Sequence, residues 1–242
     1  MSGFTEVVSV PDREIEEVHL PILTRIRDIA AETSDIVIVL LAAPAGAGKT
    51  TVTKLWEHLA ATGAGLTPVQ ALPLDGFHYP NSYLDTHSVT VDGTELPLRK
   101  LKGAPETFDV HALCKAARRL AAGEPVLWPQ YDRSIHDPVP EAITVAAPAV
   151  VIEGNFVLLD EAEWRCLRPL SRLSVFLDAD EELLRDRLVE RKVRGGRSRE
   201  DARAHYEHVD KANNRRIRSH KLPPDIDLRW EDTARGRRIV GV

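Results

Sequence analysis

Residues 35–51 read DIVIVLLAAPAGAGKTT, and this stretch decides the fold. Its first half is an unbroken run of β-branched residues and leucines, which predicts a strand buried on both faces of a parallel sheet. Its second half fits seven of the eight positions of the phosphate-binding motif G-x-x-x-x-G-K-S/T, with Ala43 in place of the first glycine. A helix is expected from Lys49 to Ala61, so the motif follows a strand and opens a helix. A working phosphate loop requires this context, which disfavours a chance match.

The loop carries the groups that bind nucleotide phosphates. Its main-chain N–H groups and the positive end of the following helix attract anions, and Gly46 and Gly48 let the main chain approach them closely. Lys49 is expected to reach the β- and γ-phosphates, and the Thr50 hydroxyl to bind Mg²⁺. We expect a negative φ at Ala43, since a left-handed alanine costs about 1–2 kcal/mol. The predicted nucleotide-binding residues of the loop are Ala45, Gly46, Ala47, Gly48, Lys49, Thr50 and Thr51.

The composition is that of a globular protein and limits the classes of partner. The 242 residues are 43% hydrophobic and 29% charged, and the net charge of −5 argues against nucleic acid or an anionic membrane as the main partner. The longest apolar run, IVIVLLAAPA, is too short to cross a bilayer, and the first residues lack the apolar core of a signal peptide. Cys114 and Cys166 form no C-x-x-C pair, so we expect two reduced thiols in a cytoplasmic protein.

Strand and helix patterns alternate along the rest of the chain. Further strands are expected at 67–75, 147–155, 172–180 and 225–230. Helices are expected at 12–33, interrupted near Pro21, and then at 109–122, 180–194 and from Ser198 onward. This alternation predicts a parallel sheet covered by helices on both faces. We expect one domain, 35–242, preceded by a helical segment, 1–34, that packs on it and whose apolar surface leaves a homodimer open.

Residues 79–108 have no clear period and are rich in proline, glycine and charge. A structureless loop of this length is uncommon unless it is functional, so we interpret it as a substrate-covering insertion. The stretches EPVLWPQYD and AITVAA flank a turn around 132–140 and indicate a small hairpin beside it. The hairpin extends the insertion to 79–140.

An acidic residue follows each of two apolar strands. Asp75 ends the strand at 67–75, and α/β sheets place their sites at strand C-termini. Asp75 is therefore expected near the transferred phosphate, as the base that orients a hydroxyl and accepts its proton. Glu153 ends the run AVVIE and is expected to act on Mg²⁺, directly or through water. The alternatives are that Asp75 caps the turn before Gly76 and that Glu153 caps the next segment.

The helix at 180–194 is rich in arginine and lysine. Arg187 and Arg191 are four residues apart, so they share a face. Such a run is either a solvated surface or a mobile lid whose arginines close over ATP. The following RGGRSRED offers glycines for a hinge, and we place a lid at 180–203. Arg187 and Arg191 are predicted to bind the nucleotide, Arg187 with a catalytic role.

Five segments together resemble the phosphoribulokinase/uridine kinase superfamily of P-loop kinases. They are APAGAGKTT (43–51), LDGFHYPN (74–81), RKLKGAPETFDV (99–110), YDRSIHDP (131–138) and IEGNFVLLDEAEW (152–164). The similarity covers about 35–235 and looks closest to bacterial members called uridine kinase-like, fructose-transport-associated or pantothenate kinase-like. It implies an α/β P-loop NTPase fold: a three-layer sandwich with a parallel five-stranded sheet of nucleoside-monophosphate-kinase type, plus a lid and an acceptor-binding insertion.

Two features depart from the family pattern. Ala43 replaces the first glycine of the loop, and VDKANNRRI (209–217) only loosely follows the family's ND-x-PNA-x-x-V. Within that segment, the resemblance makes Asn213 the asparagine on the nucleotide side.

The resemblance also implies which residues form the site. Asp75 is the base, Lys49 and Arg187 are the other catalytic groups, and Thr50 and Glu153 bind Mg²⁺. The acceptor pocket is expected among cationic, hydrogen-bonding and aromatic side chains, although packing is the alternative role for each histidine and aromatic ring. These acceptor residues are Asp75, His78, Tyr79, Arg99, Lys102, Glu106, Tyr131, Arg133 and His136.

The sequence thus predicts an ATP-dependent small-molecule kinase. It would transfer the γ-phosphate of Mg-ATP to a hydroxyl of a small polar metabolite, such as a nucleoside, a sugar or sugar acid, or a pantothenate-like molecule. Two alternatives stay open: a nucleotide-hydrolysing regulatory ATPase and a nucleoside monophosphate kinase. The guanine motif N-K-x-D of GTPases is absent, and Phe77 and His78 stand where a nucleoside monophosphate kinase would place an anchoring arginine.

Overall fold

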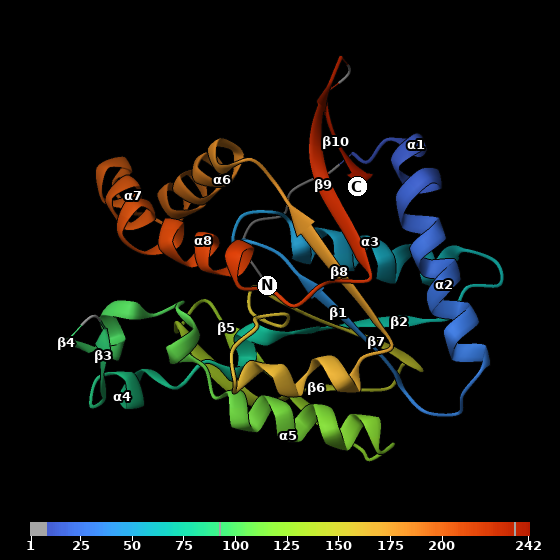
Figure 1. Cartoon of the computed structure of the whole chain (residues 1–242), viewed down its shortest axis with the longest axis horizontal. Coiled ribbons are helices and arrows are strands. Elements are labelled where there is room, and N and C mark those ends of the chain that lie inside the picture. Colours follow the sequence, from blue (N-terminus) through green and yellow to red (C-terminus); the bar gives the residue numbers. More distant parts are fainter. Residues whose placement is uncertain (1–8, 92, 235) are drawn as a thin grey trace.

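The centre of the protein is a sheet of six strands in the order β10-β9-β8-β1-β7-β2, drawn from the computed structural model in Figure 1. The structure describes residues 9–91, 93–234 and 236–242. Five strands run parallel, and β10 pairs antiparallel with β9 at one edge. The predicted α/β fold with five parallel strands is confirmed, and β10 is a strand that the sequence did not predict. The strands are β1 (Val37–Ala42), β2 (Val69–Pro73), β7 (Ala149–Gly154), β8 (Leu173–Asp178), β9 (Ile226–Thr233) and β10 (Gly236–Gly241).

Helices cover both faces of this sheet (Figure 1). Within the described ranges, no helix is both long and apolar enough to span a bilayer. The α-helices are α1 (Asp12–Glu14), α2 (Leu20–Ala31), α3 (Lys49–Thr62), α4 (Asn81–Leu84), α5 (Val110–Ala121), α6 (Glu181–Arg194), α7 (Arg199–His205) and α8 (Lys211–Ser219). The shorter 3₁₀ and π-helical turns are η1 (Ile15–His19), η2 (Leu74–Phe77), η3 (Leu98–Leu101), η4 (Pro105–Thr107), η5 (Trp164–Cys166), η6 (Arg168–Leu170) and η7 (Tyr206–Asp210).

The strand β1 is buried on both faces, as its apolar run predicts. All six of its residues are at most 1% exposed. Ile38 and Leu40 pack into a cluster with α5, whereas Val39 and Leu41 pack with α2 and α3 on the opposite face. Each β1 side chain therefore helps to fix one of the two helical layers, and the loop that follows β1 is held between them.

The N-terminal helical segment is described from residue 9, and the first eight residues of the predicted segment lie outside the described residues. The predicted interruption near Pro21 takes the form of the π-helical turn η1, since proline has no N–H to donate and a wider turn accommodates it. Ile22, Leu23 and Ile26 are buried in the core cluster of α3. The apolar surface on which the homodimer alternative depended is thus packed inside the protein.

A buried hydrogen-bond chain ties this segment to the helix that opens at the phosphate loop. The indole N–H of Trp56 donates to Nδ1 of His19 at 3.0 Å, so Nε2 carries the proton and donates to Glu14 at 3.0 Å. The other Glu14 oxygen accepts from the main-chain N–H of Ile239 at 2.9 Å. The chain joins α1, α3 and β10, and all three of its polar side chains are buried and satisfied.

The predicted insertion contains two hairpins. The first, β3 (Ser88–Val91) with β4 (Thr94–Pro97), was not predicted. The second, β5 (Leu127–Asp132) with β6 (Asp137–Thr144), is antiparallel and confirms the predicted hairpin. Its Trp128 is fully buried and donates to the carbonyl of Pro73 at 2.9 Å. The hairpin is therefore anchored at the end of β2.

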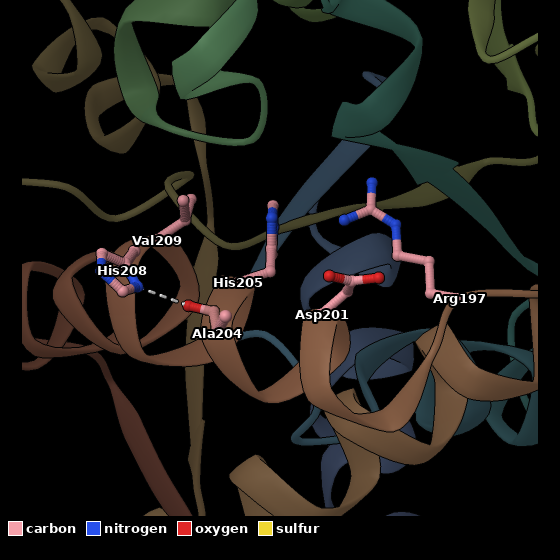
Figure 2. Close-up of a pocket in the computed structure, with 6 residues that line it drawn as sticks. All are labelled: Arg197, Asp201, Ala204, His205, His208 and Val209. Atoms are coloured by element: carbon pink, nitrogen blue, oxygen red, sulfur yellow. Dashed lines mark hydrogen bonds between the residues drawn. The ribbon is translucent and has the colours of Figure 1, made fainter.

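The predicted lid segment forms α6 and α7, which continues through the π-helical turn η7 into α8. A hollow of about 480 Å³ lies on this assembly. Figure 2 shows the side chains that line it projecting from α7, from η7 and from the turn before α7. These residues are Arg197, Asp201, Ala204, His205, His208 and Val209.

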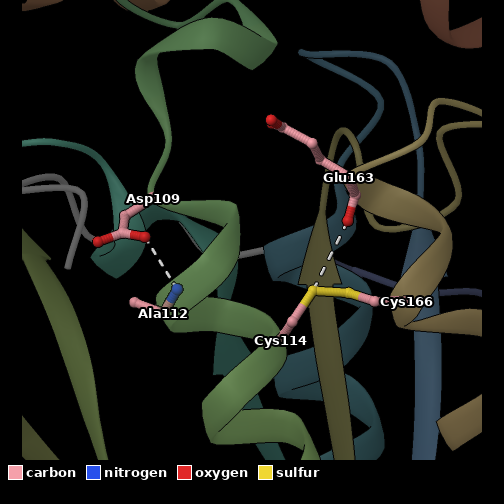
Figure 3. Close-up of a disulfide and its surroundings, with 5 residues drawn as sticks. All are labelled: Asp109, Ala112, Cys114, Glu163 and Cys166. Carbon is pink, nitrogen blue, oxygen red and sulfur yellow. Dashed lines mark hydrogen bonds between the residues drawn. A yellow bond between two sulfur atoms is a disulfide. The ribbon is translucent and has the colours of Figure 1, made fainter.

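Cys114 on α5 and Cys166 in η5 form a disulfide across 52 residues of chain (Figure 3). The prediction of two reduced thiols is therefore wrong, and the cytoplasmic location inferred from them loses that support. The pairing arises because α5 and η5 pack together through the cluster that contains Phe108, Phe156 and Trp164, which brings two cysteines without a shared motif into contact. The Cys114 sulfur also contacts the Glu163 carbonyl at 3.7 Å, a van der Waals contact because the oxidised sulfur has no proton.

Replacing both cysteines should lower the stability of the oxidised protein. A crosslink over 52 residues restricts the unfolded chain, and such disulfides contribute about 2–4 kcal/mol. We expect the C114A/C166A variant to lose about this much free energy of unfolding in urea titrations, and dithiothreitol to destabilise the wild type but not the variant. Two titratable thiols in the unreduced, denatured wild type would contradict the assignment.

Candidate active site

The phosphate loop has the backbone that the motif requires. Gly46 and Gly48 have φ of 88° and 103°, values that side chains disfavour. Among the described residues, the non-glycine residues with positive φ are His136 and Glu141, so the predicted negative φ at Ala43 is confirmed. Alanine is tolerated at position 43 because its methyl group packs in the core and the turn needs no left-handed conformation there.

The lysine and threonine of the loop face the end of β7. β1 and β7 pair in register with Ala42 opposite Gly154, so the residues after both strands meet at one edge of the sheet. The Lys49 ammonium donates to the Ala43 carbonyl at 3.3 Å and also to the side-chain oxygen of Asn155. Asn155 was not among the predicted site residues, although it lies only two residues after Glu153 in the sequence.

Glu153 lies against the predicted metal-binding hydroxyl. The Thr50 hydroxyl donates to the Glu153 carboxylate at 2.9 Å. Burial raises the pKa of Glu153, which is only 7% exposed, while the nearby Lys49 charge lowers it. Burial likewise lowers the pKa of Lys49, opposed by Glu153 and Asp75. A hydroxyl and a carboxylate side by side fit Mg²⁺, which takes few protein oxygens and completes its shell with water and phosphates.

Asp75 sits in η2, directly after β2, and points at a cation. Its carboxylate lies 3.2 Å from the Arg133 guanidinium of the β5–β6 hairpin, and both side chains are nearly half exposed. Partial burial raises the pKa of Asp75, but the positive charges of His78, Arg133 and Lys49 outweigh this effect and lower the pKa overall. Asp75 is therefore ionised at neutral pH and able to accept a proton.

A glycine allows the hairpin to come this close. A Cβ at Gly76 would lie 2.1 Å from the Pro129 carbonyl oxygen, an overlap that only backbone movement could relieve. Gly76 thus permits the main chains of η2 and β5 to touch, which brings Arg133 to Asp75. The Nδ1–H of His78 donates to the Asp75 carbonyl at 2.9 Å and closes the turn.

His78 and Tyr131 lie near Asp75, and Lys102 links Tyr131 to the main chain of His136. The Lys102 ammonium donates to the Asn81 side chain at 2.6 Å and to the His136 carbonyl at 2.7 Å, and it lies 5.1 Å from the centre of the Tyr131 ring. The His78 and Tyr131 rings are 5.2 Å apart. Burial and the charge of Asp75 raise the pKa of Tyr131 to about 12, so its hydroxyl stays protonated.

Three other predicted acceptor residues are engaged elsewhere. Arg99 lies 3.5 Å from Asp85, and the Tyr79 ring stacks on Tyr83 at 4.2 Å. Glu106 accepts from the Arg216 guanidinium at 2.7 Å, and Arg216 also bonds Glu161. These contacts hold the insertion in place, and they became visible only once distant segments were brought together.

The two predicted lid arginines point to different parts of the site. Arg187 donates to the carbonyls of Gly46 and Ala47 at 3.3 Å each, and its guanidinium lies 4.5 Å from the Trp230 ring centre. Arg191, one turn further along α6, faces the charges around Asp75: burial and repulsion from Arg133 lower its pKa, and Asp75 attracts it. Trp230 was not predicted, and its indole N–H donates to the Ala47 carbonyl at 2.7 Å.

A buried asparagine on α8 forms hydrogen bonds with the main chain near the start of the phosphate loop. The Asn214 side chain, 3% exposed, accepts from the Ala45 N–H at 2.8 Å and donates to the Ala45 carbonyl at 3.4 Å. Its neighbour Asn213, the residue that the family pattern indicated, donates instead to the Gly103 carbonyl of the insertion at 3.3 Å. The loop contact therefore belongs to the second asparagine of the ANNR segment, and α8 joins the loop to the insertion.

Comparisons with known proteins agree with this geometry. Residues 38–227 match the model of the Phosphoribulokinase / Uridine kinase family. An uncharacterized protein of Escherichia coli K12, YggC, is 42% identical over 90% of this chain and 88% of its own length. A proposed fructose transport system kinase from Silicibacter sp. TM1040 has a solved structure that is 30% identical, with a TM-score of 0.74 over 85% of this chain and 98% of that one.

More distant relatives include enzymes with named substrates. Pantothenate kinase of Salmonella gallinarum is 31% identical over 64% of this chain, which spans about half (49%) of the relative's length.

Truncating Asn214 should weaken nucleotide binding. Asn214→Ala removes both hydrogen bonds to Ala45 and takes away the side-chain partner of that main-chain N–H. We expect ATP affinity to fall about tenfold in calorimetric titrations, which corresponds to the cost of such a group. Asn213→Ala, the matched control on the same helix, should leave it within about twofold. Equal effects of the two variants would show that Asn214 has no special role in the loop.

Proposed function

We propose that this chain, which belongs to the phosphoribulokinase / uridine kinase family, transfers the γ-phosphate of Mg-ATP to a hydroxyl of a small polar metabolite. The family match and the relatives identify a P-loop kinase that acts on small molecules. The observation that carries the proposal is the position of Asp75. An ionised carboxylate lies at the same sheet edge as the phosphate loop and within the electrostatic reach of Lys49, while its other side faces the insertion.

Each group of residues has a separate role in the proposed reaction. The Asp75 carboxylate orients the acceptor hydroxyl and takes its proton as the oxygen attacks the γ-phosphorus, and the bond from the γ-phosphorus to the bridging oxygen of ADP breaks. Lys49 and the lid arginines Arg187 and Arg191 hold the phosphate oxygens and offset the charge that moves onto the leaving group. Mg²⁺, held by Thr50 and Glu153, would neutralise the β- and γ-phosphates.

The other two candidate functions receive less support. A nucleoside monophosphate kinase would need an anchoring arginine after the DG pair, and Phe77 is instead buried against Trp128 with ring centres 4.8 Å apart. A regulatory ATPase has no need of a carboxylate beside the cationic and aromatic side chains of the insertion. Arg133, Lys102 and Tyr131 suit a polar acceptor better than a single water molecule.

Replacing the base should separate binding from chemistry. We expect Asp75→Asn to keep ATP affinity within about threefold of wild type and to lose phosphoryl transfer by about 10²–10⁴-fold, measured by coupled ADP release with acceptor present. The control is Asp28→Asn, an exposed aspartate that pairs with Arg27. Transfer by Asp75→Asn at the wild-type rate would exclude Asp75 as the base.

The pH dependence offers an independent check. Nearby cations lower the pKa of Asp75, so its ionised form should persist below the ordinary aspartate value of about 3.9, and the acid limb of kcat/KM should lie there. Arg133→Gln removes one of those cations, so the pKa should rise and the acid limb should move to higher pH. Arg185→Gln, the same change on the exposed face of α6, should not move it. A wild-type limb near pH 6.5 would point to a histidine base.

A further inference from the structure

The hollow on α7 and η7 is lined by polar side chains that have no part in the proposed reaction. Arg197, Asp201, His205 and His208 line it together with two small apolar residues. Its volume of about 480 Å³ falls in the range of small-molecule sites. Figure 2 shows Arg197, from the turn before α7, and His205, from α7, projecting in the same direction with Asp201 between them.

The Arg197 guanidinium forms no ion pair with the residues that the structure describes. Within the described residues, no carboxylate lies within 4.0 Å of its guanidinium, although Asp201 lines the same hollow. Asp201 is instead bonded to the Ser198 hydroxyl at 2.7 Å, and the nearby Lys192 is paired with Asp210 at 2.7 Å. The cation left over in this cluster is therefore Arg197, whose planar fork of donors matches a carboxylate or a phosphate.

His205 supports the same interpretation. Its ring lies 3.9 Å from Asp210, and burial together with the positive charges of Lys192 and Arg197 lowers its pKa. A neutral imidazole beside an unpaired guanidinium can donate a hydrogen bond to an anion without carrying a second charge.

An uncommon backbone feature directs these side chains. η7 is a π-helical turn in the helix that runs from α7 to α8, and such turns are rare and frequent at functional sites. Its extra residue shifts the side chains that follow it around the helix. Tyr206 is buried on one side, while His208 and Val209 line the hollow on the other.

The hollow is connected to the surroundings of Asp75 through Arg191 and Asp210. On α6, Arg187 contacts the phosphate loop and Arg191 faces the charges around Asp75. Asp210, the last residue of η7, also attracts Arg191, and it lies 3.9 Å from the His205 ring in the hollow. Asn213 on α8 bonds the Gly103 carbonyl, so the helix that continues from the hollow contacts the acceptor insertion.

We propose that Arg197 and His205 bind the anionic end of the acceptor while its hydroxyl lies at Asp75. The inference rests on the proposed kinase function and adds a substrate class to it: an extended hydroxy acid or hydroxyalkyl phosphate, in preference to a neutral sugar or nucleoside. Carboxylate and phosphate share the chemistry that the guanidinium recognises, and the experiment separates them.

The test compares acceptors that differ in the anionic group alone. Wild-type protein and Arg197→Gln are assayed for ADP release with pantothenate against pantothenol, gluconate against glucitol, and ribulose 5-phosphate against ribulose. We expect the wild type to prefer the charged member of a pair. Arg197→Gln should raise KM for that member about 10- to 100-fold and leave KM for ATP unchanged. Arg203→Gln, the same charge change on α7 outside the hollow, is the matched control.

A binding measurement keeps the inference testable if none of these molecules is phosphorylated. The imidazole NMR signals of His205 and His208, assigned from the H205Q and H208Q variants, are followed while inorganic phosphate or acetate is added. We expect saturable shifts with at least one anion in wild type and none in Arg197→Gln. Absence of shifts with both anions, or an unchanged KM for charged acceptors in Arg197→Gln, would overturn the inference. Failure of transfer together with normal anion binding would count against the kinase function instead.

Discussion

The parallel pairing of β1 with β7, and of β7 with β2, is the constraint on which the site depends. Parallel strands end at the same edge of a sheet. The register places Ala42 opposite Gly154 and Pro73 opposite Glu153, so the residues that follow three separate strands converge there. Lys49, Glu153 and Asp75 are far apart in the sequence, and their meeting follows from strand order alone. The complete burial of β1 between two helical layers keeps that register fixed.

The charges at this edge explain why the site holds together before any substrate binds. Glu153 is buried and Lys49 is partly buried. Burial moves the pKa of each toward the neutral form, and the charge of the other opposes that shift. Asp75 stands among several cations and stays ionised. The cations around Asp75 outnumber its single negative charge. This excess suits the triphosphate of a nucleotide and an acceptor with its own negative charge, because both bring anions to the site.

Local patterns predicted the elements that carry a periodic or motif signal. The buried run of β1, the loop glycines and the acids after two strands are all local features, and each has the expected position. The contacts that the sequence did not reveal join residues with large separations: Asn214 and Trp230 bind the loop from the far end of the chain. Cys114 and Cys166 share no motif, and β10 is a polar edge strand whose GRRIVG resembles a loop. Such partners depend on packing, which no local pattern records.

In the proposed reaction, phosphate passes from ATP to a carbon-bound hydroxyl rather than to water. Incubation of the wild-type protein with ATP labelled with ³²P in the γ-phosphate and a mixture of hydroxy acids, sugar phosphates, sugars and nucleosides, followed by chromatography, tests it most directly. We expect label in an organic phosphate ester whose formation requires an acceptor. Label found in inorganic phosphate alone, released at the same rate with and without acceptors, would contradict it.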